Sequence, residues 1–424
     1  MVVRGTRRVA WGSRGALAAL VVMTGALLGR APSTSAAPGW REIGAPSPVG
    51  QVYAAALCPT SRLCLAADDL TSGTTRIVVS TDGGHAWRPS RLPSPPTSIA
   101  ALACPTTTEC LAVGVRGDPE VRSRLAIEVS RDAGASWSAA PLPAPLETAA
   151  FGNRLMAVAC ASALDCVAVG EATSTAPPPS NGCTPPTCVA GSSGPEGFTY
   201  GPLVLTTADG GATWAPVPVT GAFRSAAQVA CTPTDACQVA GLGYTHCVPT
   251  TPGGRTCSSA GSMLGGDLGT SGATTSPPTA TTGAWATETV PADSFTLNSV
   301  ACPGETTCLV VGQSADSTRG HGVVLLTTDA GAVWTTRPSP AGSILLASIS
   351  CVSTRDCVVT GGGGRGATPV VYQTTSAGAS WSVTARFPSL SSLGDVTCAP
   401  SGTCVAVGVA GYTRQTVRGV LLAN

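Results

Sequence analysis

Eighteen cysteines are the residues whose spacing most directly predicts chemistry in this chain of 424 residues. Fourteen of them form seven segments of the type C-x5-C. Structural zinc sites use closer cysteine pairs together with a second pair or with histidines, and this chain has three histidines. Disulfides are therefore the preferred interpretation. The expected pairs are Cys58–Cys64, Cys104–Cys110, Cys160–Cys166, Cys231–Cys237, Cys302–Cys308, Cys351–Cys357 and Cys398–Cys404.

The other four cysteines are expected to pair locally, as Cys183 with Cys188 and Cys247 with Cys257. An even count of paired cysteines is typical of an oxidised, exported protein.

The remaining reactive side chains are few. All 24 basic residues are arginines, so no lysine is available as a Schiff-base former or general base. No P-loop, no dinucleotide-binding glycine motif between a strand and a helix and no H-E-x-x-H segment occurs. We therefore expect neither a metal nor another cofactor. The net charge of +1 gives no electrostatic reason to expect a nucleic-acid partner.

Each C-x5-C segment lies between two short apolar runs, as in LNSVAC and CLVVG around residues 302–308. Short apolar runs separated by turn residues indicate strands. A hairpin brings residues of its two strands to about 4.5–5.5 Å between Cα atoms, which is within reach of a disulfide. Each cysteine pair is thus expected to join the first two strands of a repeat.

A second motif, S/T-x-D-x-G-x-x-W, follows most of these hairpins, as in STDGGHAW at 80–87. At 374–381 the aspartate is replaced by Ser376, and a remnant of the motif ends at Trp285. A short Asp or Ser side chain can bind nearby backbone N–H groups and hold a turn. Glycine permits a positive φ there, and tryptophan supplies a large apolar plate. The residues expected to act structurally are Asp82, Trp87, Asp132, Trp137, Asp209, Trp214, Asp329, Trp334 and Trp381.

This motif resembles the Asp-box of the BNR-repeat, sialidase-like β-propellers. The recurring frame G…VLLTTDGG.TW is most similar to the photosystem II assembly and stability factor group, although the cysteine hairpins depart from that pattern. The resemblance implies four-stranded blades in which the box joins the third and fourth strands as a folding device. It does not imply a photosynthetic role, because one fold supports many functions.

The predicted fold is all-β, a seven-bladed β-propeller with a repeat of about 47 residues. The last repeat stops after its third strand, VRGVLLAN, and Trp40 with the residues after it forms an orphan fourth strand. Pairing of this N-terminal strand with the last blade would close the ring and remove two sheet edges.

Residues 1–36 are predicted to be a signal peptide, and residues 37–424 the propeller. Arg4, Arg7, Arg8 and Arg14 precede an apolar run at 15–29, and small residues around Ala36 offer a cleavage site. We expect a bacterial protein that is secreted or associated with the cell wall, with no stable membrane insertion after cleavage, and monomeric. Retention of the segment as an anchor is the alternative.

Chain order separates two faces of the propeller. The cysteine hairpins and the Asp-box turns share one face, named here the stapled face. The connections between the second and third strands, and those between blades, share the opposite, variable face. Insertions at 171–200 and 241–284 are expected there, each with its own cysteine pair. They are either an ordered lip or flexible Pro/Ser/Thr-rich segments.

The variable face carries the candidate ligand-binding side chains. Arginines that converge around a propeller axis could hold a carboxylate or a phosphate through paired hydrogen bonds. The alternative is ordinary solvated loop charge. The candidates are Arg116, Arg122, Arg124, Arg154, Arg224, Tyr244, His246, Arg319, His321, Arg365, Tyr412 and Arg414.

Three functions remain open on these residues. The first is a non-enzymatic extracellular propeller that binds a protein or glycan ligand or serves as an assembly scaffold. The second is a sialidase-like glycoside hydrolase. Most aspartates are taken by Asp-boxes or cysteine hairpins, and no Tyr–Glu nucleophile pair is evident, so no catalytic residue is predicted. The third is a cell-surface adhesion protein that uses the same variable face.

Overall fold

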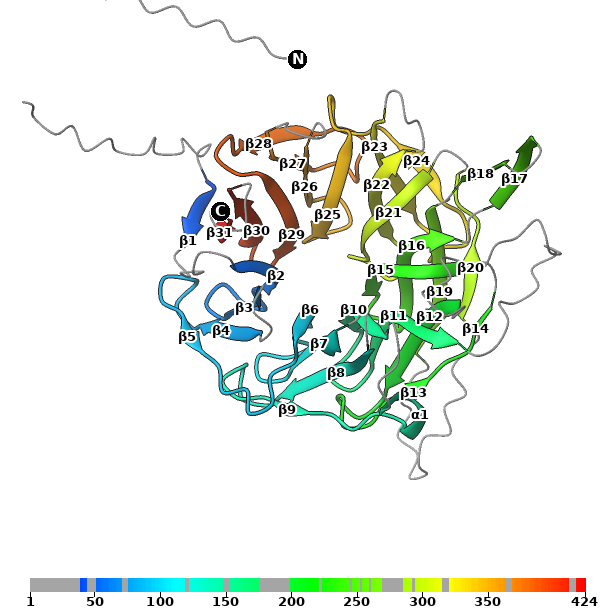
Figure 1. The fold of residues 1–424 in the computed structure, drawn as a ribbon. Coiled ribbons are helices and arrows are strands. Elements are labelled where there is room, and N and C mark those ends of the chain that lie inside the picture. Colours follow the sequence, from blue (N-terminus) through cyan, green and yellow to red (C-terminus); the bar gives the residue numbers. More distant parts are fainter. Residues whose placement is uncertain are drawn as a thin grey trace, which may run out of the picture. The chain divides into compact units, whose positions relative to one another are not determined.

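Short apolar strands pair into successive antiparallel sheets in the computed structural model, and these sheets stand as blades around one axis (Figure 1). The chain divides into Met1–Ser35 and Ala36–Asn424, and the second unit contains the propeller. The expected signal peptide at 1–36 lies outside the described residues. The structure describes residues 39–43, 51–70, 75–118, 122–147, 153–174, 199–220, 223–243, 246–251, 254–258, 261–268, 285–291, 294–314, 320–362, 368–411 and 417–424.

Seven blades form the ring, which confirms the predicted fold class (Figure 1). Blade one consists of β2 (Gln51–Leu57), β3 (Cys64–Leu70), β4 (Arg76–Ser80) and β5 (Arg88–Pro89). Blade two consists of β6 (Ser98–Ala103), β7 (Cys110–Asp118), β8 (Arg122–Ser130) and β9 (Ser138–Ala139). Blade three consists of β10 (Arg154–Cys160), β11 (Cys166–Ser174), β12 (Thr199–Thr207) and β13 (Ala215–Pro216). The four-residue helix α1 (Ala144–Glu147) lies between β9 and β10.

Blade four contains β15 (Phe223–Cys231), β16 (Ala236–Gly243), β19 (Gly261–Asp267) and β20 (Trp285–Glu288), with β14 (Val219–Thr220) added in parallel to β20 as a fifth strand. Blade five consists of β21 (Ser294–Ala301), β22 (Cys308–Ser314), β23 (Gly322–Thr327) and β24 (Thr335–Arg337). Blade six consists of β25 (Leu345–Cys351), β26 (Cys357–Gly362), β27 (Val370–Thr374) and β28 (Ser382–Arg386). Blade seven consists of β29 (Ser392–Cys398), β30 (Cys404–Ala410), β31 (Arg418–Ala423) and β1 (Arg41–Ile43).

The N-terminal strand closes the ring as predicted. β1 pairs antiparallel with β31, with Arg41 opposite Ala423 and Ile43 opposite Leu421. Trp40 is buried in an apolar cluster shared by blades six and seven. Pairing the two ends of the described chain leaves blade seven with a complete set of four strands.

The apolar core lies between blades. Each of seven clusters joins residues of two neighbouring blades, as when Leu65 and Ile77 of blade one pack with Ile99 of blade two. The motif tryptophans take part in these contacts, since Trp137 of blade two packs on blade one and Trp214 of blade three packs on blade two. Burial of apolar surface between neighbours therefore holds each blade in the ring.

All seven predicted cysteine hairpins carry their disulfide, with Cα–Cα separations of 3.9–4.1 Å. A loop this short is worth about 2 kcal/mol per disulfide in the chain-entropy treatment. Cys247 and Cys257 lie opposite each other in the hairpin of β17 (His246–Thr251) and β18 (Gly254–Ser258). Cys183 and Cys188 lie outside the described residues.

The turn after the third strand is held by hydrogen bonds from its own backbone. In blade one, Asp82 Oδ1 accepts hydrogen bonds from the amides of His85 and Ala86, and Ser80 Oγ accepts one from the amide of Gly84. The Ala86 amide and the Ser80 hydroxyl lower the pKa of Asp82, because both interactions favour the carboxylate. Blade six forms the same turn with Ser376, whose Oγ accepts the amide of Ser380.

Blade four departs from the sequence prediction. Its third strand, β19, lies inside the stretch 241–284 that was expected to be one insertion between the second and third strands. That expectation was wrong, because GSMLGGD at 261–267 pairs with β16 although it lacks the VLLTTD frame. In chain order, residues 244–260 therefore fall between β16 and β19, and the rest of the stretch follows β19.

A half-buried carboxylate, Glu288, lies in the fourth strand of blade four. Glu288 accepts hydrogen bonds from the Trp334 indole at 2.7 Å and from Gln238 Nε2 at 3.0 Å. Burial raises the pKa of Glu288. In blades one to three the motif tryptophan instead donates to a glycine carbonyl of its own turn. Glu288 thus links blade four to blade five in the one blade whose sequence keeps only a remnant of the Asp-box motif.

Every first strand carries a β-bulge at the same place, shown by a shift in pairing with the second strand, as between Leu346 and Ser348. In blades two to six a backbone carbonyl beside the bulge lies close to the glycine of the C-x-x-x-G frame in the second strand. A Cβ at Gly361 would lie 2.3 Å from the carbonyl oxygen of Leu345, and one at Gly312 would lie 1.9 Å from that of Thr296. Glycine fits these two positions because a side chain there would displace the neighbouring backbone.

Two adjacent glycines of β26 test this close approach. We expect Gly361→Ala to lower the free energy of unfolding by about 3 kcal/mol, because strand β25 must move. Gly362→Ala is the matched control, since its nearest neighbour would be 3.7 Å away. The control should leave stability unchanged or slightly raised. Urea unfolding curves of the two variants give the comparison, and equal stabilities would contradict the assigned role of the bulge.

The serine turn of blade six tests the contribution of the turn carboxylates. Ser376→Asp should raise Tm at pH 7, because the new carboxylate would accept the same amide as a charged acceptor. Its folded-state pKa should lie below the unfolded value near 4. The gain should therefore be fully present above pH 5 and disappear as the pH falls through the folded-state pKa. Ser376→Asn is the uncharged control, and a similar pH dependence for both variants would argue against the charge.

Candidate functional site

The predicted ligand-binding residues fall into three groups. Arg116, Arg124, Arg154, Arg224 and His321 are described with their side chains. Arg124 and His321 are exposed, and Arg224 is partly buried. Arg122 and His246 begin β8 and β17, where only the backbone is described. The others lie outside the described residues, and they are Tyr244, Arg319, Arg365, Tyr412 and Arg414.

Three arginines on successive blades share one arrangement. Arg76 in blade one, Arg116 in blade two and Arg154 in blade three each bind a carboxylate and keep part of the side chain exposed, at 44%, 28% and 44%. The carboxylates beneath them are largely buried, at 2%, 2% and 12% exposure. We name these three residues the arginine row. A planar guanidinium that is fixed by a carboxylate and keeps part of its surface exposed is pre-organised for an anion.

The partners in the arginine row are specific. Asp68 accepts the Nε of Arg76 at 3.0 Å and the Arg76 amide at 2.9 Å. Glu171 accepts Nε and Nη2 of Arg154 at 3.0 and 2.8 Å, through a single carboxylate oxygen. The other oxygen of Glu171 accepts the hydroxyl of Ser225 in blade four. The carboxylates thus fix the arginines and, at Glu171, also link two blades.

Arg76 was not among the predicted residues, although the sequence held a signal for it. In the six other blades the residue four positions after the second cysteine is glycine, and at five of these glycines, such as Gly114 and Gly361, a first-strand carbonyl approaches closely. Blade one has Asp68 at that position. A buried aspartate in place of this glycine needs a cationic partner, and Arg76 supplies it.

Glu128 is the most perturbed of these carboxylates. It is 2% exposed, and burial raises its pKa to about 7 even though the nearby Arg116 lowers it. Arg116 also donates to the backbone carbonyl of Ser94. The pair therefore changes its charge near neutral pH, within the range where a binding surface would operate.

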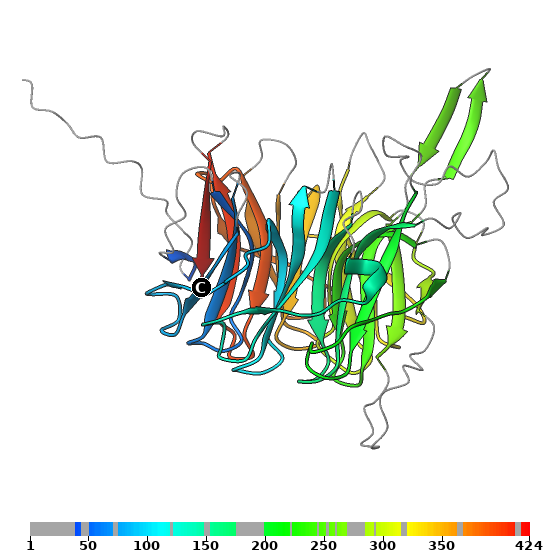
Figure 2. The same cartoon turned by 60° about the horizontal axis from the view of Figure 1, so that its bottom comes forward.

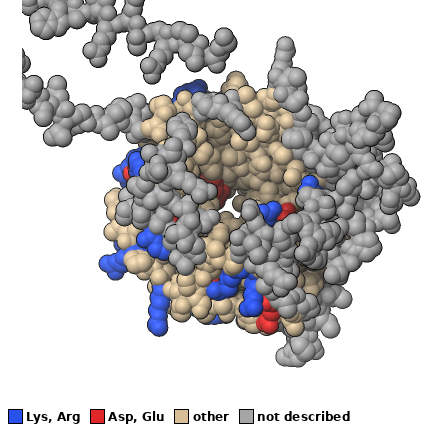
Figure 3. Space-filling model, in the orientation of Figure 1, with Lys and Arg blue, Asp and Glu red and all other residues tan. Residues whose placement is uncertain are grey.

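A second candidate site is the channel along the propeller axis, which is hollowed on the face shown in Figure 3. A cavity of about 430 Å³ is lined by the first strand of every blade. Its wall has two unlike halves. The lining residues of blades one to three are all apolar, and they are Ala54, Ala55, Ala56, Leu57, Ala100, Ala101, Leu102, Met156 and Val158.

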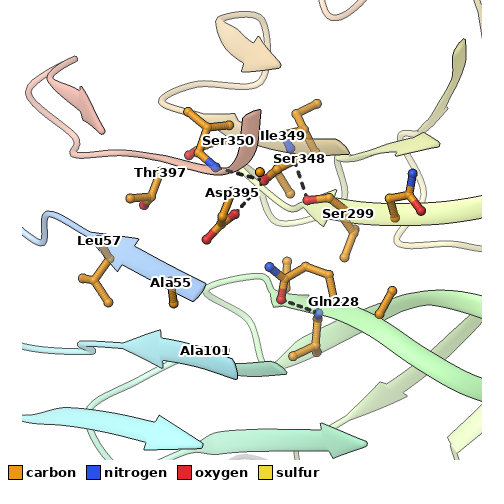
Figure 4. Close-up of a pocket in the computed structure, with 18 of the residues that line it drawn as sticks. Ala55, Leu57, Ala101, Gln228, Ser299, Ser348, Ile349, Ser350, Asp395 and Thr397 are labelled. Atoms are coloured by element: carbon orange, nitrogen blue, oxygen red, sulfur yellow. Dashed lines mark hydrogen bonds between the residues drawn. The ribbon is translucent and has the colours of Figure 1, made fainter. Parts of the chain in front are cut away.

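Every polar side chain in the described lining comes from blades four to seven. These residues are Gln228, Asn298, Ser299, Ser348, Ser350, Asp395 and Thr397. Figure 4 shows Asp395 and Gln228 projecting into the same space from different strands. Asp395 is the one charged side chain among the described lining residues.

Hydrogen bonds between neighbouring first strands position this polar half. Ser299 Oγ accepts the amide of Ile349 at 3.2 Å, and Ser348 Oγ accepts the amide of Val396 at 3.2 Å (Figure 4). The Ser348 hydroxyl donates to Asp395 Oδ1 at 2.7 Å. Burial raises the pKa of Asp395, and the hydrogen bond from Ser348 only partly offsets this. Asp395 is therefore oriented by hydroxyl and amide groups but lacks a cation beside it in the described lining.

The channel residues were missed by the sequence analysis, although the signal was present. The third residue before the first cysteine of each hairpin reads Ala, Ala, Ala, Gln, Ser, Ser, Asp from blade one to blade seven. Aligning the repeats on the cysteines would have shown this change from apolar to polar residues. Within the described part of the chain no group of three or more His, Cys, Asp or Glu side chains is placed to hold a metal ion.

The perturbed pKa of Glu128 gives a test of the arginine row. Between pH 4.5 and about 7 the folded chain retains a proton that the unfolded chain has lost. The free energy of unfolding should therefore fall as the pH rises through this window, and Glu128→Gln should remove that slope. Glu109→Gln, which removes an exposed ion pair with Arg131, should keep it. Urea unfolding at pH 5 and pH 8 measures both, and an unchanged slope in Glu128→Gln would refute the assignment.

No family model matches the chain, and no curated protein matches it. Among the described residues, no helix is long and apolar enough to span a membrane. Solved structures do match over nearly the whole chain. YCF48 from Cyanidioschyzon merolae is 13% identical over 91% of this chain and 98% of its own, with a TM-score of 0.52. YCF48 bound to D1 peptide is 13% identical over 91% and 96%, with a TM-score of 0.53.

A PL25 ulvan lyase, a polysaccharide lyase, matches equally well, at 10% identity over 91% of this chain and 95% of its own, with a TM-score of 0.53. Identities this low show a common fold and leave function open. The chain therefore shares the β-propeller fold of YCF48, in line with the resemblance read from its repeats.

Proposed function

We propose that this chain is an exported, non-enzymatic propeller that binds an acidic segment of a partner protein across the arginine row. The observation that carries the proposal is the pre-organisation of Arg76, Arg116 and Arg154 on three successive blades. Figure 3 shows basic side chains spread over the sector that holds blades one and two. Guanidinium groups fixed by buried carboxylates bind an incoming carboxylate with little loss of side-chain freedom.

Two further observations support a protein ligand and an extracellular setting. YCF48, which shares this fold, binds D1 peptide, so this ring architecture can accept a peptide. Seven disulfides in short hairpins form and persist in oxidising compartments. We accordingly assign residues 1–36 to export and the Asp-box residues to a structural role.

The proposal is tested with fluorescein-labelled acidic peptides. A ten-residue peptide rich in Glu and Ala should bind the mature chain, and its Gln-containing counterpart should bind at least tenfold more weakly. Replacing Arg76, Arg116 and Arg154 by Gln together should reduce the affinity at least tenfold. The affinity should also fall with added salt, because the contacts are electrostatic. Fluorescence anisotropy measures each of these quantities.

Arg131→Gln is the matched control, because Arg131 lies in a turn on the stapled face and pairs with Glu109. It should leave peptide affinity unchanged. Equal losses in the control and in the triple variant, or no binding of the acidic peptide, would refute the proposal. Turnover of fluorogenic sialosides or depolymerisation of ulvan by the purified chain would replace it with the enzymatic alternative.

A further inference from the structure

We propose that the axial channel is a second binding site, selective for an organic cation that carries an apolar body, with Asp395 facing the ammonium or guanidinium group. This site is separate from the arginine row, because its lining contains none of the three arginines. It takes a ligand of opposite charge, so the two sites can be tested independently.

The charge of the channel points to a cation. Asp395 is the one ionisable side chain among the described lining residues, and no arginine or histidine lines the cavity beside it. A carboxylate enclosed by protein without a cation loses solvation that a bound cation would replace. Ser348 holds the carboxylate through one oxygen, Oδ1, so its orientation is set before any ligand arrives.

The shape of the wall points to an apolar body on that cation. Across the channel, blades one to three present alanines with Leu57, Leu102 and Met156. A hydrated inorganic ion gains nothing from such a wall, whereas an alkyl or aromatic stem gains apolar contact. The cavity of about 430 Å³ also lies within the range of about 300–1,000 Å³ that is common for small-ligand sites.

The register of the blades explains why the two halves meet at one level. Ala55, Ala101, Gln228, Ser299, Ser348 and Asp395 all stand three residues before the first cysteine of their hairpin. Each therefore occupies the equivalent position next to the bulge of its strand. A ligand near this level would have the carboxylate on one side and the partly exposed apolar residues Ala54, Ala100 and Met156 on the other.

Hexylamine and its neutral counterpart 1-hexanol test the proposal by calorimetry on the mature chain. Hexylamine should bind at least tenfold more tightly than hexanol, and Asp395→Asn should abolish that difference. Glu109→Gln, which removes a carboxylate outside the channel, should preserve it. Ala100→Met narrows the channel on its apolar side. Methionine is chosen because blade three already has Met156 at the equivalent position. The substitution should weaken the binding of both probes.

The absence of lysine from the chain permits a direct localisation. Carbodiimide activation should couple bound hexylamine to Asp395 as an amide, and peptide mass spectrometry should find the adduct in residues 392–398. A second arm uses acetyl-Ala-Ala-Lys-Ala-Ala-amide against its norleucine form. Binding of the lysine peptide identifies a partner's side chain as the source of the cation. Binding of hexylamine alone identifies a free small amine.

The pH dependence provides a readout in the unmodified chain. The adjacent first strands, β25 and β2, present Ala347, Ser348, Ser350, Ala54, Ala55 and Leu57 to the cavity, and none of these residues titrates. Because burial raises the pKa of Asp395, hexylamine affinity should increase with pH as the carboxylate ionises. This measurement keeps the proposal testable if Asp395→Asn fails to fold.

Several results would overturn the proposal. Equal affinities for hexylamine and hexanol, or unchanged hexylamine binding in Asp395→Asn, would show that Asp395 does not select a cation. Thermal stabilisation by CaCl₂ that depends on Asp395, without amine binding, would assign the carboxylate to a metal ion. Loss of acidic-peptide binding in the arginine-row variants bears on the proposed function and leaves the channel result unaffected.

Discussion

The close approach of a bulged first strand to a glycine in the second strand is the constraint on which the rest of the structure depends. The bulge places the carbonyl of Leu345 where a Cβ of Gly361 would stand, and other blades repeat the contact. Since a bulge redirects the side chains that follow it, the same distortion presents a short segment of each first strand to the axis. The channel is thus a consequence of how each blade is built.

The same constraint explains why the polar half of the channel is both structural and available to a ligand. Ser299 and Ser348 accept amides from the neighbouring blade, so their first role is to join adjacent first strands. In blade seven the equivalent residue is charged. It is Asp395, whose carboxylate accepts a hydrogen bond from the hydroxyl of Ser348. On the other side of Asp395, the neighbouring first strand of blade one offers Ala55 at the equivalent position. The carboxylate therefore stands at the boundary between the polar and apolar halves.

Sequence reasoning predicted the ring, its closure and the disulfides because each rests on local or repeated patterns. Seven cysteine pairs at one spacing specify seven hairpins, and Trp40 followed by a strand specifies the missing fourth strand of blade seven. It failed in blade four, where GSMLGGD forms a third strand without the usual frame. Tertiary pairing with β16 overrode the weak local pattern, as is common for strands.

The candidate sites were harder to predict, because they depend on which side chains meet across blades. Arg116 and Arg154 were predicted as candidate ligand-binding residues, but their pairing with largely buried carboxylates was not predicted. Asp395 was overlooked because nothing within its own repeat marks it. The carboxylates of the two sites also differ in their partners. Glu171 neutralises an arginine of its own blade, whereas Asp395 has only hydroxyl and amide groups around it in the described lining. A protein that encloses a carboxylate without a cation accepts a cost in stability, and a cationic ligand that enters the channel would remove that cost.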